Sequence, residues 1–226
     1  MDAKEHFVTN RLALFDCDGT LVDGQHSICA AMTQAFEAEG LAPPARAAIL
    51  DVVGLSLPVA MARLLPDLDP AAHDMLSDRY KQVFQAMRQA GGVQEPLFDG
   101  IADLIARLDG EGWMLGVATG KSDRGLALVL AAHGLSDRFV TLQTADRHPS
   151  KPHPSMIWQA MADAGATPET TVMIGDTSYD VEMGLAAGCR TIGVGWGYHL
   201  PDHLHACGAH ALAMDMDELY RHIAAA

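Results

Sequence analysis

The chain has 226 residues, of which 49% are hydrophobic and 19% charged, a composition typical of a folded globular protein rather than a disordered one. Its formal net charge of −14 argues against nucleic acid or an anionic membrane as a partner. No apolar run approaches the roughly 20 residues of a membrane span, the charged first residues lack a signal-peptide segment, and the four cysteines form no CxxC pair, so we expect a cytoplasmic protein.

The first predicted element is a buried strand that ends in two aspartates. Its apolar residues 12–15 lead into Asp16, Asp18, Gly19 and Thr20, and a short apolar run followed by a glycine turn is typical of a parallel sheet. Ligands bind at the carboxyl ends of such strands, and the Gly19 turn would bring Asp18 beside Asp16. Two carboxylates this close repel by about 4 kcal/mol at an effective dielectric near 20, so we expect a cation between them.

The next part of the chain, residues 25 to about 92, contains no convincing strand. Ile28, Met32 and Phe36 recur at helical spacing, and glycine and proline breaks separate the apolar groups that follow. This pattern predicts four or five helices that form a small bundle. The further apolar groups lie at residues 45–53, 59–65 and 75–87.

From Asp99 onward the pattern alternates between helices and strands, which is typical of a parallel sheet covered by helices on both faces. We therefore predict an α/β fold with a doubly wound parallel sheet and an inserted α-helical domain. The core domain would comprise residues 1–22 and 95–226, and the helical domain residues 23–94. Helices are expected near residues 101–108, 124–133, 157–161, 181–187 and 218–225, and strands at 113–119, 139–143, 171–175, 190–194 and 210–213.

Three further segments at predicted strand ends carry polar groups that could form one site with Asp16 and Asp18. Thr119 and Gly120 offer a hydroxyl and an open backbone N–H for a phosphate oxygen, and Lys151 is a point charge for phosphate or carboxylate. Asp176, with Asp180 as a further candidate, adds carboxylates to the same edge of the sheet. The expected site is an acidic cluster with Lys151 as its only obvious protein cation, and such oxygen ligands suit Mg²⁺.

In this order, these motifs resemble the haloacid dehalogenase (HAD) superfamily. The motifs are Asp16-x-Asp18-Gly19-Thr20, Thr119, Lys151 and Gly175-Asp176-x-x-x-Asp180. A helical insert after the first motif is similar to the cap of the phosphoglycolate phosphatase and β-phosphoglucomutase branch. The resemblance covers essentially the whole chain and implies a HAD-like Rossmannoid core.

The resemblance also implies a role for each matching residue. Asp16 would attack phosphorus and form an aspartyl-phosphate, and Asp18 would protonate the leaving alkoxide and later accept a proton from water. Mg²⁺ would be held by Asp16, the Asp18 backbone carbonyl and Asp176. Thr119, Gly120 and Lys151 would bind the phosphate. Asp180 would position Lys151 or a metal-bound water. Gly19 and Thr20 would have supporting roles in the first loop.

The function expected from these roles is a Mg²⁺-dependent phosphatase that acts on a small phosphorylated metabolite such as phosphoglycolate, as a monomer or homodimer. A phosphomutase of the β-phosphoglucomutase type is the first alternative. A haloacid dehalogenase is a weaker alternative, because its reaction needs the nucleophile but no general acid at the position of Asp18, and this chain has one there. A non-catalytic protein on this scaffold is weaker still because every catalytic position is filled.

Some residues are left open or depart from the pattern. Many relatives carry Asn or Ser where this chain has Gly120, and the cap turn at residues 54–57 lacks the basic side chain expected for a small dianionic substrate. Lys121 could be either a surface residue or a substrate contact. The histidines between residues 199 and 210 match no familiar zinc pattern, and we expect them in a solvated loop.

Overall fold

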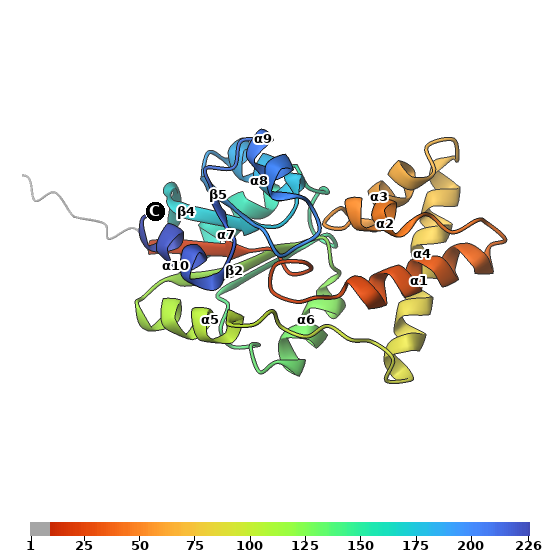
Figure 1. Cartoon of the computed structure of the whole chain (residues 1–226), viewed down its shortest axis with the longest axis horizontal. Helices are drawn as coiled ribbons and strands as arrows, with labels where there is room; N and C mark the ends of the chain where they lie inside the picture. The colour runs from red at the N-terminus through yellow and green to blue at the C-terminus, as the bar shows by residue number, and fades with distance from the viewer. Residues whose placement is uncertain (1–9) are drawn as a thin grey trace, which may run out of the picture.

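A parallel sheet forms the centre of the computed structural model, which describes residues 10–226 (Figure 1). The first nine residues of the predicted core domain lie outside this range. The sheet has six strands in the order β3-β2-β1-β4-β5-β6, and each neighbouring pair is parallel. The strands are β1 (Asn10–Phe15), β2 (Met114–Thr119), β3 (Thr141–Thr144), β4 (Ala166–Gly175), β5 (Arg190–Val194) and β6 (Ala211–Ala213).

Helices cover both faces of the sheet because side chains alternate along each strand. Ala13 and Phe15 of β1 pack with α5 (Ile101–Gly110), α6 (Asp123–Ala132) and α10 (Met216–Ala224). Leu12 and Leu14 face the opposite side, where α7 (Ser155–Ala164) and α8 (Ser178–Ala187) pack. The prediction of a doubly wound α/β fold with an inserted helical unit is therefore confirmed.

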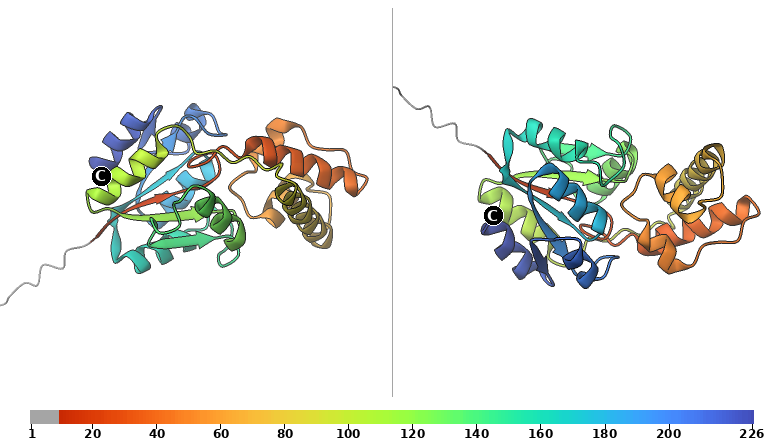
Figure 2. Two further views of the ribbon diagram at one scale, coloured as in Figure 1. Left: turned by 90° about the horizontal axis from the view of Figure 1, so that it is seen from below. Right: turned by 90° about the horizontal axis from the view of Figure 1, so that it is seen from above.

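The inserted helical unit lies beyond the carboxyl ends of the strands (Figures 1 and 2). Its apolar core is formed by side chains such as Ile28, Phe36 and Met61. Two linkers join it to the sheet and pair with each other through the Asp23 N–H, which donates to the Pro96 carbonyl at 2.8 Å. The unit comprises α1 (Gln25–Ala38), α2 (Arg46–Asp51), α3 (Leu57–Leu64) and α4 (Pro70–Gln89).

Two elements differ from the sequence-based expectation. Strand β4 begins at Ala166 rather than at residue 171. Its first residues are polar and include Pro168, a pattern that is more typical of a loop than of a strand. The segment expected to be a solvated loop contains the short helix α9 (Pro201–Ala206), in which Leu204 alone is buried. One buried residue is too weak a periodic signal to predict a helix. Within residues 10–226, no helix is long and apolar enough to cross a membrane.

Candidate functional site

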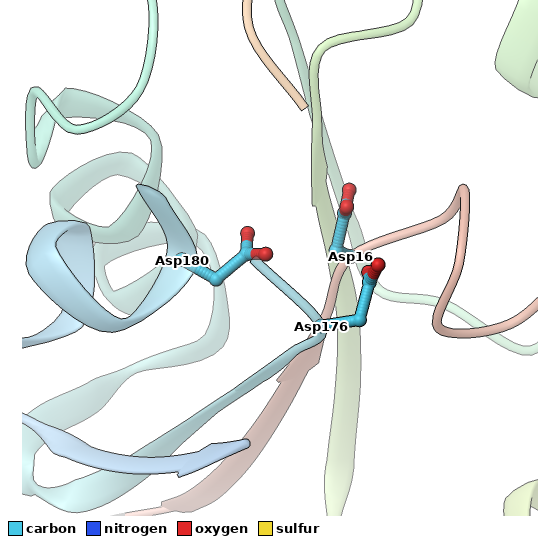
Figure 3. A group of neighbouring side chains, drawn as sticks. All are labelled: Asp16, Asp176 and Asp180. Atoms are coloured by element: carbon cyan, nitrogen blue, oxygen red, sulfur yellow. The ribbon is translucent and has the colours of Figure 1, made fainter. Parts of the chain in front are cut away.

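Three buried carboxylates meet at the carboxyl edge of the sheet. Asp16 follows β1, Asp176 follows β4, and Asp180 lies in the first turn of α8. In Figure 3 the side chains of Asp16 and Asp176 project side by side and that of Asp180 points toward them. One oxygen of each lies within 4.8 Å of the others. None of the three residues is more than 1% exposed. Segments more than 150 residues apart in the sequence thus form one acidic cluster.

The Lys151 ammonium joins two of these carboxylates. Its Nζ lies 2.9 Å from Asp16 Oδ1 and 2.6 Å from Asp180 Oδ1. The other oxygen of Asp180 accepts hydrogen bonds from the backbone N–H (3.1 Å) and the hydroxyl (2.7 Å) of Thr177. The bond from the backbone N–H is part of the capping box of α8. Because Asp180 is fixed by the start of a helix, it in turn fixes Lys151 beside Asp16.

Asp176 is held by the first loop and by the loop after β5. The Thr20 hydroxyl donates to Asp176 Oδ1 at 2.8 Å, and the Tyr198 N–H donates to Oδ2 at 2.9 Å. Gly19 has a φ of +83°, and a Cβ at this position would lie 2.2 Å from Asp176 Oδ2. Glycine is therefore required here both for the turn and for the close approach of the two loops.

The cluster holds more negative than positive charge. Burial raises the pKa of Asp16 to about 7, an effect that Asp180 increases and Lys151 opposes. Burial, followed by the charges of Asp16 and Asp180, raises the pKa of Asp176 well above its ordinary value. Among residues 10–226, neither oxygen of Asp16 has a hydrogen-bond donor of good geometry. Buried, under-satisfied carboxylate oxygens are the ligands that a hard divalent cation prefers, so the residues present fit such an ion.

The second aspartate of the first motif belongs to a separate ionic chain. Asp18 Oδ1 lies 3.0 Å from Lys121 Nζ, which lies 2.7 Å from Glu95 Oε1. Arg88 contacts the other oxygen of Glu95 at 2.6 Å. Burial raises the pKa of Asp18, whereas Lys121 opposes this rise. The expectation that Lys151 is the only cation at the site was therefore wrong, and Lys121 also contacts a motif aspartate. Its position two residues after Thr119 is the sequence signal that could have placed it at this edge.

The loop between α2 and α3 closes over the edge of the sheet. The Ser56 N–H donates to the Ser150 hydroxyl at 2.9 Å, and the Tyr179 hydroxyl donates to the Asp51 carbonyl at 2.7 Å. A Cβ on Gly120 would lie 2.6 Å from the Gly54 carbonyl oxygen. The backbone of this loop therefore occupies the space that a side chain at residue 120 would need.

His199 also takes part in this contact. It is 6% exposed, its Nδ1 accepts from the Ser178 N–H at 3.1 Å, and its Nε2 lies 3.2 Å from the Asp51 carbonyl oxygen. The expectation of a solvated residue was wrong for His199, whereas His203, His205 and His210 are exposed.

A cavity of about 340 Å³ separates the sheet edge from the helical unit. Asp16, Asp18 and Thr119 line its floor together with Gly120, while its walls come mainly from apolar side chains of the helices. The structure thus brings the four motifs, which contain Asp16, Thr119, Lys151 and Asp176, to one edge of the sheet. The Asp18 carboxylate is turned toward Lys121 rather than toward Asp176.

Residues 13–194 match the sequence profile of the haloacid dehalogenase-like hydrolases. A probable phosphatase IndB of Dickeya dadantii is 38% identical, covering 86% of this chain and 85% of that protein. A phosphoglycolate phosphatase of Xylella fastidiosa is 31% identical, with 83% and 81% coverage. The crystal structure of a predicted phosphatase from Clostridium acetobutylicum superposes with a TM-score of 0.87 at 25% identity, covering 96% of this chain and 100% of that one.

We expect Gly120→Ala to displace the loop at residues 51–57, because the added methyl group would strike the carbonyls of Gly54 and Leu55 at 2.6 and 2.7 Å. Hydrogen exchange followed by mass spectrometry should show at least about tenfold faster exchange in this loop, which corresponds to about 1.4 kcal/mol. Gly110→Ala is the matched control, since a Cβ there meets nothing within 4 Å. Unchanged exchange in Gly120→Ala would contradict the close packing described.

Proposed function

The chain belongs to the haloacid dehalogenase-like hydrolases, and on this premise we propose that it is a Mg²⁺-dependent phosphatase of small phosphorylated metabolites. The observation that carries the proposal is the buried carboxylate of Asp16, which lines the cavity together with Asp18 and Thr119 and has the Lys151 ammonium at 2.9 Å. In this proposal residues 23–94 form the cap, and residues 1–22 and 95–226 form the catalytic core.

Asp16 is the nucleophile. A carboxylate oxygen attacks the phosphorus atom of the substrate, the bond between phosphorus and the ester oxygen breaks, and an aspartyl-phosphate forms. Attack on a phosphate dianion requires nearby positive charge, because two anions repel strongly where water is excluded. Lys151 supplies part of this charge, and Asp180 keeps its ammonium in place through the contact at 2.6 Å.

Asp18 is the general acid and then the general base. Its protonated carboxyl gives a proton to the leaving alkoxide, and the resulting carboxylate accepts a proton from the water that attacks the aspartyl-phosphate. Burial raises the pKa of Asp18, which favours the protonated form required for the first step. Lys121 at 3.0 Å holds the carboxyl group over the cavity and stabilises the carboxylate required for the second.

The transferred phosphoryl group is held by the end of β2 and by the loop before α7. Thr119 lies at the end of β2 and supplies a hydroxyl, and Gly120 supplies a backbone N–H. Lys151 completes this set from the loop before α7. Because phosphoryl transfer has little covalent chemistry for the protein to perform, positioning and charge account for most of the catalysis.

Asp16, the backbone carbonyl of Asp18 and Asp176 would hold the Mg²⁺ ion. When bound, the ion neutralises charge on the phosphate and lowers the repulsion between it and the acidic cluster. Thr20 and the Tyr198 N–H orient Asp176 for this purpose through the hydrogen bonds at 2.8 and 2.9 Å. Asp180 also lies within the cluster, and its oxygens are committed to Lys151 and Thr177.

The direct test of the function is the release of inorganic phosphate from a panel of phosphorylated metabolites in the presence of Mg²⁺. We expect the wild-type chain to release phosphate and Asp16→Asn to be at least about 10³-fold slower, since an amide is a poor nucleophile. Isomerised product without free phosphate would favour a phosphomutase instead. Chloride release from chloroacetate would favour a dehalogenase, and retained activity in Asp16→Asn would exclude Asp16 as the nucleophile.

Asp18→Asn should slow turnover by about 10²- to 10⁴-fold with alkyl phosphates, because the leaving alkoxide then has no proton donor. The rate of aspartyl-phosphate formation should fall much less with aryl phosphates such as p-nitrophenyl phosphate, because their leaving group needs no proton. A pre-steady-state burst of p-nitrophenol from this variant is the measurement. An equal loss of the burst and of alkyl-phosphate turnover would contradict the acid role.

Mg²⁺ should stabilise the wild-type chain against thermal unfolding. A ligand at 100 times its dissociation constant contributes about 2.7 kcal/mol, and for a chain of this size that shifts the melting temperature by about 5 to 10 °C. Asp176→Asn should lose most of this shift, whereas Asp202→Asn, an exposed residue on α9, should retain it. An equal Mg²⁺ response in wild type and Asp176→Asn would remove Asp176 from the ion site.

A further inference from the structure

The cavity above the acidic cluster has an apolar wall that the chemistry of phosphoryl transfer does not use. We define the apolar wall as six cap side chains that line the cavity opposite its polar floor. Aliphatic side chains from α1, α2 and α3 form one part, and two aromatic rings of α4 form the other. The six residues are Ile28, Met32, Ile49, Leu57, Tyr80 and Phe84.

The two aromatic residues form a continuous surface. Tyr80 and Phe84 lie one turn apart on α4, and their ring centroids are 5.7 Å apart with an angle of 36° between the planes. Both are only partly buried, so that each presents part of its ring to the cavity. Met32 adds a polarisable thioether to the same wall, a group that makes favourable contacts with aromatic rings. An apolar or aromatic ligand group would find contacts here at little desolvation cost.

Most cations around the cavity are already paired. Lys81 contacts Asp78 at 3.1 Å, Arg88 contacts Glu95 at 2.6 Å, and Lys121 lies between Asp18 and Glu95. Within residues 10–226, Arg124 is the lining cation without a carboxylate partner, and its guanidinium lies 3.5 Å from the Gln85 amide oxygen.

This arrangement is unfavourable for a substrate that carries a second negative charge next to its phosphate. A carboxylate placed against Tyr80 and Phe84 would lose its hydration, and among residues 10–226 Arg124 is the one lining cation free of a carboxylate that could compensate it. Burial of a charge with so little compensation is costly. An uncharged apolar group placed there instead gains free energy in proportion to the area that it buries. The walls of the cavity therefore favour the phosphate ester of an apolar alcohol over the phosphate ester of an alcohol that carries a carboxylate.

We propose that the preferred substrates are phosphate monoesters of an alcohol whose uncharged apolar group is about the size of one ring and packs against Tyr80 and Phe84. The cavity of about 340 Å³ lies at the lower end of the volumes of small-molecule sites, which limits the group to roughly this size. The inference rests on the proposed phosphatase function, because it assigns the substrate class of that same site.

Three alkyl phosphates test the proposal: benzyl phosphate, ethyl phosphate and phosphoglycolate. All three have an alkoxide leaving group, so their rates compare the contacts of the attached group. We expect kcat/KM for benzyl phosphate to exceed that for each of the others by at least tenfold. If neither these three esters nor the panel of metabolites releases phosphate with Mg²⁺ present, the proposed function fails. If the panel does but these three do not, the function stands and the substrate assignment is overturned. If phosphate is released but benzyl phosphate has no advantage, the function stands and the substrate assignment is overturned.

The residue that carries the preference is tested by Phe84→Ala. The ratio of kcat/KM for benzyl phosphate to that for ethyl phosphate should fall at least fivefold in this variant. Met75→Ala is the matched control, since Met75 lies on the same helix and is 48% exposed. An unchanged ratio in Phe84→Ala would overturn the role of the wall.

A second measurement on the wild-type chain does not depend on the variant being folded. Benzylphosphonate cannot be hydrolysed at its phosphorus–carbon bond, and it should inhibit with a constant at least tenfold below that of ethylphosphonate. Equal inhibition by the two phosphonates would overturn the assignment.

Discussion

The imbalance of buried charge at the carboxyl edge of the sheet is the constraint on which the rest of the site depends. Asp16, Asp176 and Asp180 meet with little access to water and are faced by the ammonium of Lys151. Burying charges without full compensation costs several kcal/mol per ion, so such a cluster persists only where the surrounding structure enforces it. The raised pKa of Asp16 and Asp176 expresses that cost, and the proposed Mg²⁺ ion would offset part of it.

The fold enforces the cluster through rigid elements. Two of the carboxylates directly follow buried strands, and the third caps a helix, so that none depends on a free loop. Asp180 both caps a helix and orders a cation: one oxygen accepts from the Thr177 N–H in the capping box of α8, and the other accepts from Lys151. The helical unit is held against this edge by contacts such as the hydrogen bond from the Ser56 N–H to the Ser150 hydroxyl. Placing reactive groups on packed elements of this kind preserves their geometry to within a fraction of an ångström.

Much of the fold could be predicted from the sequence because its buried strands are continuous apolar runs and the cap helices have clear periodicity. The meeting of Asp16, Lys151 and Asp176 followed from a general property of parallel sheets, namely that their carboxyl ends share one edge. Helix α9 was missed because it buries only Leu204. The lower part of β4 was missed because its polar residues and Pro168 resemble a loop.

Other parts of the site depend on tertiary contacts that no local pattern encodes. Lys121 is an ordinary lysine in the sequence, and only the fold brings Glu95 and Asp18 to opposite sides of its ammonium. The absence of a side chain at Gly120 is explained by the backbone of a loop about 65 residues earlier in the chain. The apolar wall likewise combines residues of α1 to α4 whose hydrophobic character alone predicts packing within the bundle rather than an open cavity.

The central claim is that Asp16 carries the phosphoryl group during turnover. It is tested most directly by quenching the wild-type chain in acid during steady-state hydrolysis with Mg²⁺ and locating the modification by peptide mass spectrometry. The account predicts the mass of one phosphoryl group on Asp16 and none in protein quenched without substrate. A phosphoryl group on another residue, or rapid phosphate release with no modified Asp16 at any quench time, would contradict it.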